Sequence, residues 1–250
     1  MIHSAWHNYL NYGCDIGGYR VDPDATNKTL GRNTDTFIRW FQLGAFLPLM
    51  ENGGNGEHRP WLFGSNVVEI YKEFANIHTS LAPYLLNAGT VCYAKNVSVI
   101  KPMAVRTPFG IANDFDYLLF DDLFVSPFVD NSTSKKIKFA GFKTEEWSYW
   151  FDVNQTYAGG HTATVNVPFT EYPAFIKKGS IVPLNIQRTY TQLGGSRSSE
   201  SYLTLMITKP IIDELYRREF HEFEAKGYAV TYKYNKRAAE LTVFSSAHKS

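Results

Sequence analysis

Apolar residues recur every three to four positions in two stretches of the first hundred residues, which is the spacing of helices. One helix is expected to begin after Asn33 or Thr34, either of which can cap it, and to end at Pro48. A longer helix is expected over residues 66–88. Pro83 lies inside this second stretch and should kink the helix, because proline removes one backbone hydrogen bond and clashes with the preceding turn.

Strand-like segments flank these helices and then dominate the chain. Residues 9–14 are aromatic-rich and closed by glycine, as expected of a buried strand, and residues 97–102 form another. The order strand, loop, helix, loop, helix, strand is typical of two consecutive units of a (β/α) barrel. After residue 117 short apolar runs alternate with turn residues, which indicates an antiparallel sandwich. These runs cover residues 118–120, 123–125, 136–139, 162–165 and 175–176, with further candidates at 203–207, 229–234 and 240–244.

Composition narrows the classes of partner. The 250 residues carry a formal net charge of +1, so no charged field points to nucleic acid or to a membrane surface. No apolar run approaches the ~20 residues of a membrane helix. Cys14 and Cys92 cannot form a disulfide framework, and no CxxC pair suggests a metal site. The aromatic content of 16% fits the stacking of sugars as well as it fits the usual composition of β-rich domains.

The cellular compartment stays open. Residues 1–6 lack the basic segment and apolar run of a signal peptide. A secretory or lysosomal parent would use Asn-x-Ser/Thr sequons, but such tripeptides also arise by chance. The sequons begin at Asn27, Asn96, Asn131 and Asn154.

Two loops hold the polar groups that could carry chemistry, since barrel enzymes place their working residues on the loops after strands. In residues 13–19, Asp15 directly follows the expected strand, so rigid backbone would hold its carboxylate in the barrel mouth. Two glycines then allow a tight turn close to a ligand, and Tyr19 could form an aromatic wall. Alternatively, Asp15 caps its own loop or pairs with Arg20.

The second loop, residues 51–61, combines three glycines, two acids, His58, an arginine and a tryptophan. This density is typical of long functional loops, and these side chains can donate to and accept from sugar hydroxyls. A solvated loop with internal ion pairs would have the same composition.

Residues 150–155 look like an active-site strand that ends in a carboxylate nucleophile, Asp152. They lie among the short strands, with Gly159 and Gly160 close behind. A hairpin with Asp152 in its turn is therefore the expected structure.

Several stretches taken together resemble glycoside hydrolase family 31. Residues 13–19 are similar to that family's G-x-D-I-x-G-F/Y motif, and residues 39–48 to its R-W-x-Q-L-G-A-F-x-P helix. Residues 82–85 match the L-P-Y-L of its next helix, and residues 119–127 resemble the F/G-D-D-L-L-V-A-P start of its sandwich. Residues 147–167 and 174–184 resemble its W-Y-D…G-G…P-V-F-V-R-x-G-S-I-I-P-L close, so that the matches follow the family's order over about residues 4–185.

The resemblance implies an α/β fold followed by an all-β fold. Residues 1–103 would be the last strands and helices of a (β/α)8 barrel, and residues 104–188 the proximal antiparallel β-sandwich. Residues 189–250 would be part of a distal β-domain. The implied partner is a carbohydrate, an α-glycoside, and no metal or organic cofactor is implied.

The family consists of retaining α-glycosidases that use two aspartates. One attacks the anomeric carbon, and the other protonates the leaving oxygen and then activates water, with the two carboxyls about 5 Å apart. In the family both precede the motif at residues 13–19, in a W-x-D-M-N-E strand and a G-D-N turn. This chain contains neither pattern, so the resemblance implies that it holds no catalytic residue and is inactive alone.

The resemblance carries three substrate-binding residues over to this chain. Asp15 would bind hydroxyls in subsite −1, and Tyr19 would occupy the aromatic platform. The family's R-N-H-N signature is replaced here by residues 51–54, Glu-Asn-Gly-Gly, and the histidine stands five residues after Gly53, which occupies the family's histidine position. His58 would fill the role through a different loop path. That departure leaves the substrate preference open. Tyrosine in place of phenylalanine at the platform occurs in family members with various substrates, so α-glucose, α-xylose and sulfoquinovose all remain candidates.

Two other hypotheses fit the same sequence. A noncatalytic carbohydrate-binding module built from the sandwich would explain both the aromatic residues and the missing carboxylates. A truncated gene product or an incomplete gene model would have no function of its own. Calorimetry with oligosaccharides on residues 97–250 tests the first, and the genomic sequence upstream of Met1 tests the second.

Overall fold

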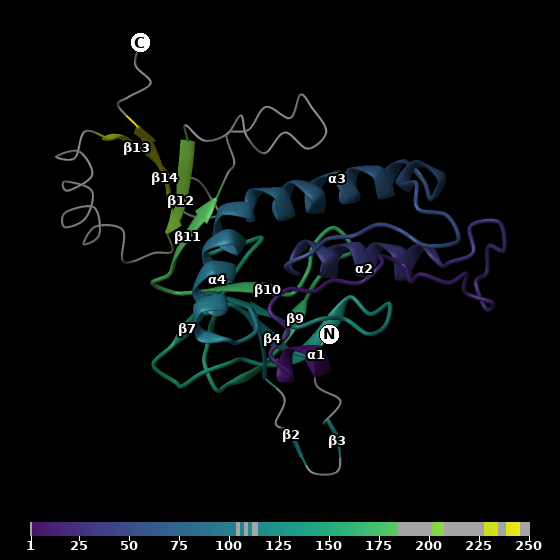
Figure 1. Cartoon of the computed structure of the whole chain (residues 1–250), viewed down its shortest axis with the longest axis horizontal. Helices are drawn as coiled ribbons and strands as arrows, with labels where there is room; N and C mark the ends of the chain where they lie inside the picture. The colour runs from purple at the N-terminus through teal and green to yellow at the C-terminus, as the bar shows by residue number, and fades with distance from the viewer. Residues whose placement is uncertain are drawn as a thin grey trace.

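The computed structural model describes the backbone of residues 2–103, 106–107, 110–111, 115–184, 202–207, 228–234 and 239–245, with the side chains of residues 2–103 and 115–184. Helices occupy the first of these segments and antiparallel sheets the later ones, as Figure 1 shows. The predicted succession of a helix-containing part and an all-β part is confirmed at this level. Among the described residues, no helix is long and apolar enough to cross a bilayer.

The helices follow the predicted apolar spacing, with one difference. The stretch expected as a single kinked helix over 66–88 is two helices that meet at Leu81. Pro83 stands in the first turn of the second one, where its missing N–H is not needed for a helical hydrogen bond. The helical elements are α1 (Ile2–Trp6), α2 (Thr34–Ala45), η1 (Pro60–Leu62), α3 (Ser65–Ser80) and α4 (Ala82–Lys95).

The buried strand predicted over residues 9–14 is not formed. The chain there is irregular, Tyr9 is 64% exposed, and Leu10 O accepts one hydrogen bond from Val99 N–H. In the described part of the chain, parallel pairing is limited to a single bridge between Asp15 and Glu51. A strand exists only through its hydrogen-bonded neighbours, so an apolar run with one bridge stays a loop. The prediction was wrong for that reason.

A six-stranded antiparallel sheet forms the centre of the second part. Its strand order is β1-β4-β5-β10-β7-β8. The members are β1 (Ile100–Pro102), β4 (Tyr117–Leu119), β5 (Leu123–Val125), β10 (Ala174–Lys177), β7 (Glu146–Tyr149) and β8 (Thr156–Ala158). The sequence predicts a strand over 97–102 that follows the last helix of a barrel unit. In the structure its ordered part, β1, pairs antiparallel with β4 and so opens this sheet.

Three smaller antiparallel sheets complete the described strands. One pairs β6 (Ser134–Lys138) with β9 (Thr162–Asn166), and another pairs β2 (Arg106–Thr107) with β3 (Gly110–Ile111). The third has the order β11-β12-β14-β13, formed by Ile181–Leu184, Tyr202–Ile207, Ala239–Ser245 and Tyr228–Tyr234. The strands predicted after residue 117 coincide with members of these four sheets. Strands β2, β3 and β11 were not predicted, and β7 and β8 were expected only as the hairpin around Asp152.

The hairpin expected around Asp152 is confirmed. Strands β7 and β8 pair antiparallel, and Asp152 lies in the turn between them. Its Oδ1 accepts a hydrogen bond from Asn154 N–H at 3.1 Å, and its backbone oxygen accepts one from Gln155 N–H at 3.0 Å. Asp152 is therefore a turn residue.

One hydrophobic core runs from the helices into the six-stranded sheet. Phe46, just after α2, stands at the junction. Its ring lies 5.6 Å from the ring of Trp150 and 6.3 Å from that of Tyr172, between centroids. Its backbone oxygen accepts a hydrogen bond from Tyr117 Oη at 2.9 Å. Because the two parts share these contacts, the position of α2 is set by the sheet.

Arg39 makes the polar contacts at the same junction. Its side chain is buried on the sheet side of α2, with the guanidinium carbon 4.2 Å from the ring centroids of both Phe128 and Phe169. The guanidinium donates four hydrogen bonds, and three of the acceptors lie more than ninety residues away in the sequence. The acceptors are Gln42 Oε1 at 3.0 Å and the backbone oxygens of Glu171, Ser132 and Val167 at 3.2, 2.8 and 3.4 Å.

Replacing Arg39 with methionine should lower the free energy of unfolding by about 3 kcal/mol, because buried carbonyl oxygens would lose charged donors while the apolar stem is kept. Denaturant unfolding followed by circular dichroism measures the change. Arg20→Met is the control, since Arg20 is exposed and should change stability by less than about 0.5 kcal/mol. Equal stability of the two variants would show that Arg39 does not hold the two parts together.

Candidate functional site

The two polar loops singled out from the sequence lie side by side. Ile16 N–H donates to Glu51 O at 2.9 Å, next to the parallel bridge between Asp15 and Glu51. Further along, Asn55 N–H donates to Tyr19 O at 2.6 Å. These backbone contacts make loop 13–19 and loop 51–61 one continuous surface.

Asp15 is half-buried where the loops meet. A Cβ atom added to Gly53 would stand 3.3 Å from Asp15 Oδ1, so the carboxylate faces the start of the second loop. Within the described part of the chain Asp15 makes no ion pair, and Arg20 is exposed. The alternative in which Asp15 pairs with Arg20 is therefore not what the structure contains.

Arg32, which the sequence analysis did not single out, fastens the two loops to each other. Its side chain is only 1% exposed in a site formed by backbone oxygens. Nη1 donates to Ile16 O at 2.8 Å, and Nη2 donates to Gly18 O at 3.2 Å and to Asn55 O at 2.6 Å. Burial lowers the pKa of Arg32, and the nearby negative charge of Glu57 opposes that shift. The sequence feature that comes nearest to indicating this role of Arg32 is the number of glycines in the two loops. Gly17 and Gly56 lie against its side chain.

The backbone geometry requires glycine at two positions in these loops. Gly17 has a φ of 80°, and a Cβ atom there would lie 2.3 Å from Arg32 Nη1. Gly54 has a φ of 104°, and a Cβ atom there would lie 2.5 Å from Tyr19 O. Both positions combine a left-handed backbone with a close approach between the loops, so only glycine fits.

His58 lies inside the second loop and is held by that loop. Its Nδ1 is 3.1 Å from Asn52 Oδ1, and its Nε2 is 2.8 Å from Gly54 O. The Asn52 amide in turn donates to His58 O at 3.0 Å, and Arg32 Nη1 stands 3.5 Å from His58 Nδ1. Both ring nitrogens therefore face oxygen atoms of their own loop.

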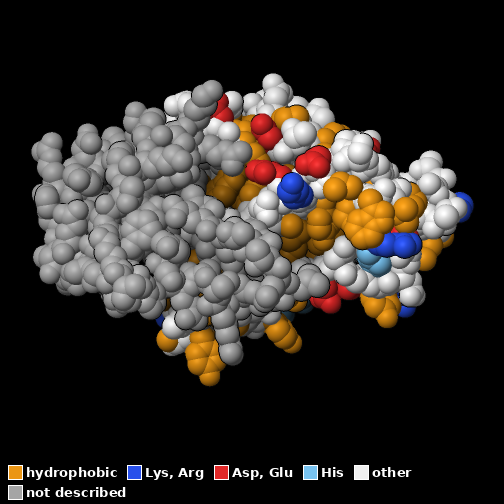
Figure 2. All heavy atoms as spheres, turned by 90° about the horizontal axis from the view of Figure 1, so that it is seen from above, with side chains coloured by type: hydrophobic (Ala, Val, Ile, Leu, Met, Phe, Trp, Pro, Cys, Tyr) orange, Lys and Arg blue, Asp and Glu red, His pale blue; other side chains and the backbone are white. Residues whose placement is uncertain are grey.

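The loops also present aromatic side chains to solvent. Tyr19 is 62% exposed and Trp61, in η1, is 63% exposed. A hollow of about 430 Å³ lies beside Trp61, between the second loop and α3, and is lined in part by His58, Arg59 and Tyr71. Figure 2 shows one face of the molecule, on which apolar side chains gather next to charged groups.

The second loop does contain the internal ion pair considered above. Glu57 Oε2 is 2.7 Å from Arg59 Nη2, and Glu57 Oε1 accepts hydrogen bonds from Arg59 Nε and from the backbone N–H groups of His58 and Arg59. These hydrogen bonds, chiefly those from Arg59, lower the pKa of Glu57 to about 2. The ion pair folds the loop back at His58.

Cys14 is not exposed as a nucleophile. Its Sγ accepts a hydrogen bond from Trp40 Nε1 at 3.0 Å, and burial raises the pKa of the thiol. A raised pKa keeps the sulfur protonated and unreactive at neutral pH.

Comparison with known proteins identifies the class to which these loops belong. Residues 1–88 match the family model described as the glycosyl hydrolases family 31 TIM-barrel domain, and residues 96–182 match the glycosyl hydrolase family 31 C-terminal domain. Both models describe enzymes that act on glycosides. The chain belongs to glycosyl hydrolase family 31.

Curated relatives carry several activities of that family. The chain is 31% identical over 201 residues to a 1,6-alpha-glucosyltransferase of Sporosarcina globispora, which covers 76% of this chain and 15% of the relative. It is 28% identical over 222 residues to neutral alpha-glucosidase C of Mus musculus, with 85% and 23% covered. An alpha-xylosidase of Emericella nidulans is 25% identical over 185 residues, with 71% and 23% covered.

Solved structures share the fold. A dextranase of Flavobacterium johnsoniae superposes with a TM-score of 0.67 at 17% identity, covering 98% of this chain and 39% of the other. An α-xylosidase of Xanthomonas citri gives a TM-score of 0.62 at 20% identity, covering 83% and 27%. The chain therefore spans between 15% and 39% of the length of these relatives.

Gly17→Ala should destabilise the protein by about 2 kcal/mol, because the new methyl group is strained at positive φ and displaces the Arg32 guanidinium. Gly89→Ala in α4 is the matched control, since its Cβ atom would meet only Asn11 Nδ2 at 4.0 Å. A helical glycine in open space should gain stability on replacement, by about 0.5 kcal/mol. Thermal unfolding of both variants measures the difference, and a harmless Gly17→Ala would contradict the role given to Arg32.

The Glu57 ion pair should make loop 51–61 sensitive to acid. The folded pKa of Glu57 lies near 2, below its ordinary value of 4.5, so its stabilising effect is present above 4.5 and is lost as pH falls through 2. The amide proton shifts of His58 and Arg59, followed by NMR, should titrate with a midpoint near 2. Glu57→Gln should abolish the transition, and a midpoint near 4.5 in the parent chain would show that the pair does not form.

Proposed function

We propose that this chain supplies one side of the sugar pocket of a retaining α-glycosidase. Membership of family 31 supports the reaction class, and the contact between loops 13–19 and 51–61 supports the pocket. In this proposal residues 1–103 are the end of a (β/α)8 barrel, residues 104–188 the proximal sandwich and residues 189–250 part of the distal β-domain.

Asp15 is the residue on which the pocket depends in this proposal. Its carboxylate is half-buried beside Gly53 and makes no ion pair within the described part of the chain, so it can accept hydrogen bonds from two neighbouring sugar hydroxyls. Tyr19 would stack its exposed ring against one face of the sugar. His58 would reach a hydroxyl only by giving up Gly54 O or Asn52 Oδ1, so its main effect is on the shape of the loop.

The attacking and proton-donating aspartates of the proposed enzyme lie outside these 250 residues. The sequence contains neither W-x-D-M-N-E nor G-D-N. Asp152 follows a strand-like segment as a nucleophile would, but it is a turn residue. The chain alone is therefore expected to bind sugar weakly and not to hydrolyse it. The substrate of the whole enzyme is an α-glycoside, with glucose, xylose and sulfoquinovose as the candidate sugars.

The decisive assay is hydrolysis of 4-nitrophenyl α-glucoside, α-xyloside and α-sulfoquinovoside. We expect no turnover by the purified 250-residue chain and turnover once a segment carrying both missing motifs is joined to it. In that joined protein Asp15→Asn should lower kcat/KM about 100-fold, since about 3 kcal/mol of hydrogen bonding to a charged acceptor is lost. Asp24→Asn, at an exposed position that follows the first loop, should leave kcat/KM unchanged.

Turnover by the 250-residue chain that Asp15→Asn abolishes would overturn the proposal, because Asp15 would then be acting as a catalytic acid. An active joined protein that is indifferent to Asp15→Asn would show that the pocket is elsewhere. Glu69→Gln, on the outer face of α3, serves as a second control for general effects of charge removal.

A further inference from the structure

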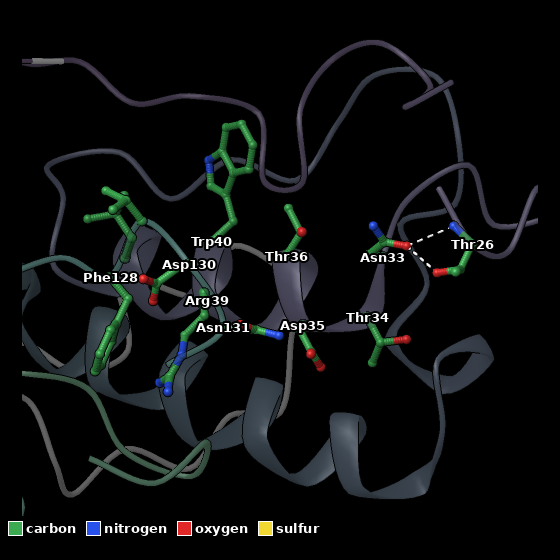
Figure 3. A pocket seen from close by; sticks show the side chains of 12 residues that line it. Thr26, Asn33, Thr34, Asp35, Thr36, Arg39, Trp40, Phe128, Asp130 and Asn131 are labelled. Carbon is green, nitrogen blue, oxygen red and sulfur yellow. Dashed lines mark hydrogen bonds between the residues drawn. The ribbon is translucent and has the colours of Figure 1, made fainter. Parts of the chain in front are cut away.

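A groove separate from the two loops lies between α2 and the loop that follows β5 (Figure 3). Its volume is about 770 Å³, the size of a small-ligand site. One wall is the outer face of α2, from Asp35 and Thr36 to Trp40, and the opposite wall is formed by Val129, Asp130 and Asn131. In Figure 3 the side chains of Thr36 and Trp40 project from α2 on the same side, and that of Asp35 projects on the opposite side.

The groove is rich in polar groups that the fold does not use. The side chains of Asp35, Thr36 and Asn131 are exposed, and they make no hydrogen bond within the part of the chain that the structure describes. Thr26 and Asn33, at the far end of the groove, are bonded to each other instead. A carboxylate, a hydroxyl and an amide that face one cavity offer both donors and acceptors to a ligand.

Apolar surface lies next to these groups. The indole of Trp40 donates its N–H to Cys14 Sγ, so its ring surface and not its polar atom is available in the groove. Val129 is 71% exposed on the opposite wall. A flat aromatic ring beside hydroxyl-binding groups is the combination that recognises a sugar, whose faces are apolar and whose rim is polar.

Two carboxylates, Asp35 and Asp130, and one guanidinium, Arg39, line the groove, so its formal charge is negative. Hydrogen bonds from Ser132, and more weakly the positive charges of Lys135 and Arg39, lower the pKa of Asp130 and keep it ionised. Asp35 also lies close enough to Arg39 to affect its pKa. The Arg39 guanidinium itself is enclosed by Phe128 and Phe169 and has its own acceptors, so it is not a receptor for an anion. A neutral ligand therefore fits better than a phosphate or a carboxylate.

We propose that this groove is a second saccharide-binding site, distinct from the loops that carry Asp15. Its ligand is a neutral oligosaccharide, with one sugar unit against Trp40 and Thr36 on one side of α2 and the hydroxyls of another unit on Asp35 and Asn131. Trp40 also links the groove to the first loop, since a Cβ atom on Gly18 would lie 3.7 Å from its ring. The inference stands on the groove alone and does not require the proposed glycosidase function.

The test is a titration of the 250-residue chain with isomaltotriose and with maltotriose, followed by NMR and by calorimetry. Thr36→Trp should fill the groove and Asp35→Ala should remove a hydroxyl acceptor, and each should weaken binding at least about tenfold. Glu69→Ala, at an equally exposed position of α3, should leave the affinity unchanged. Amide shifts of Asp35, Thr36 and Asn131 report binding in the groove separately from those of residues 13–19, so weak binding at the loops is measured on its own. Circular dichroism establishes that each variant is folded.

Two results would overturn this proposal. Binding that persists in Thr36→Trp would show that the groove is not the site, and Asn131→Trp, which blocks the groove from the other wall, gives an independent repeat. Absence of binding by the folded parent chain would remove the site altogether. Binding that Asp15→Asn abolishes and Thr36→Trp spares would locate the sugar at the loops, which contradicts the second site and supports the proposed function.

Discussion

The guanidinium of Arg32, buried among backbone oxygens, is the interaction on which the candidate site depends. It donates to Ile16 O and Gly18 O in the first loop and to Asn55 O in the second. A buried cation must have its donors satisfied, and the three backbone oxygens do this for Nη1 and Nη2, whereas Nε has no hydrogen-bond partner among the described residues. Glu57 of the second loop pairs with Arg59, whereas Asp15 of the first loop makes no ion pair among the described residues.

Two buried arginines fix the position of helix α2. Arg32, just before it, holds the loops, and Arg39, inside it, holds the sheet through carbonyl oxygens of β-strand loops. The Phe46 ring fixes the end of the same helix against Trp150 and Tyr172. A displacement of α2 would therefore change the contacts of the loops, the contacts of the sheet and the shape of the groove beside Trp40. The helix is the element through which the candidate site and the antiparallel sheets share one geometry.

The sequence predicted features that depend on residues close together in the chain. It missed features that depend on residues far apart in the chain. Apolar spacing located α2 and the helical stretch beyond it, because a helix satisfies its own backbone. Residues 9–14 failed as a strand, because a strand depends on neighbours that its own sequence does not supply. The meeting of the two loops followed from barrel order, but Arg32 did not. Its acceptors are backbone oxygens of distant residues, which leave no side-chain pattern to detect.

The buried aromatic rings weigh against reading the second part as a sugar-binding module. Phe124, Phe139, Trp147 and Phe175 all lie in the core of the sheets and pack on one another. The high aromatic content therefore has a structural cause there. In the two loops, by contrast, the aromatic side chains of Tyr19 and Trp61 are exposed to solvent. With both ring nitrogens of His58 facing oxygens of its own loop, sugar selectivity in this chain would rest on Asp15 and on the shape of the second loop.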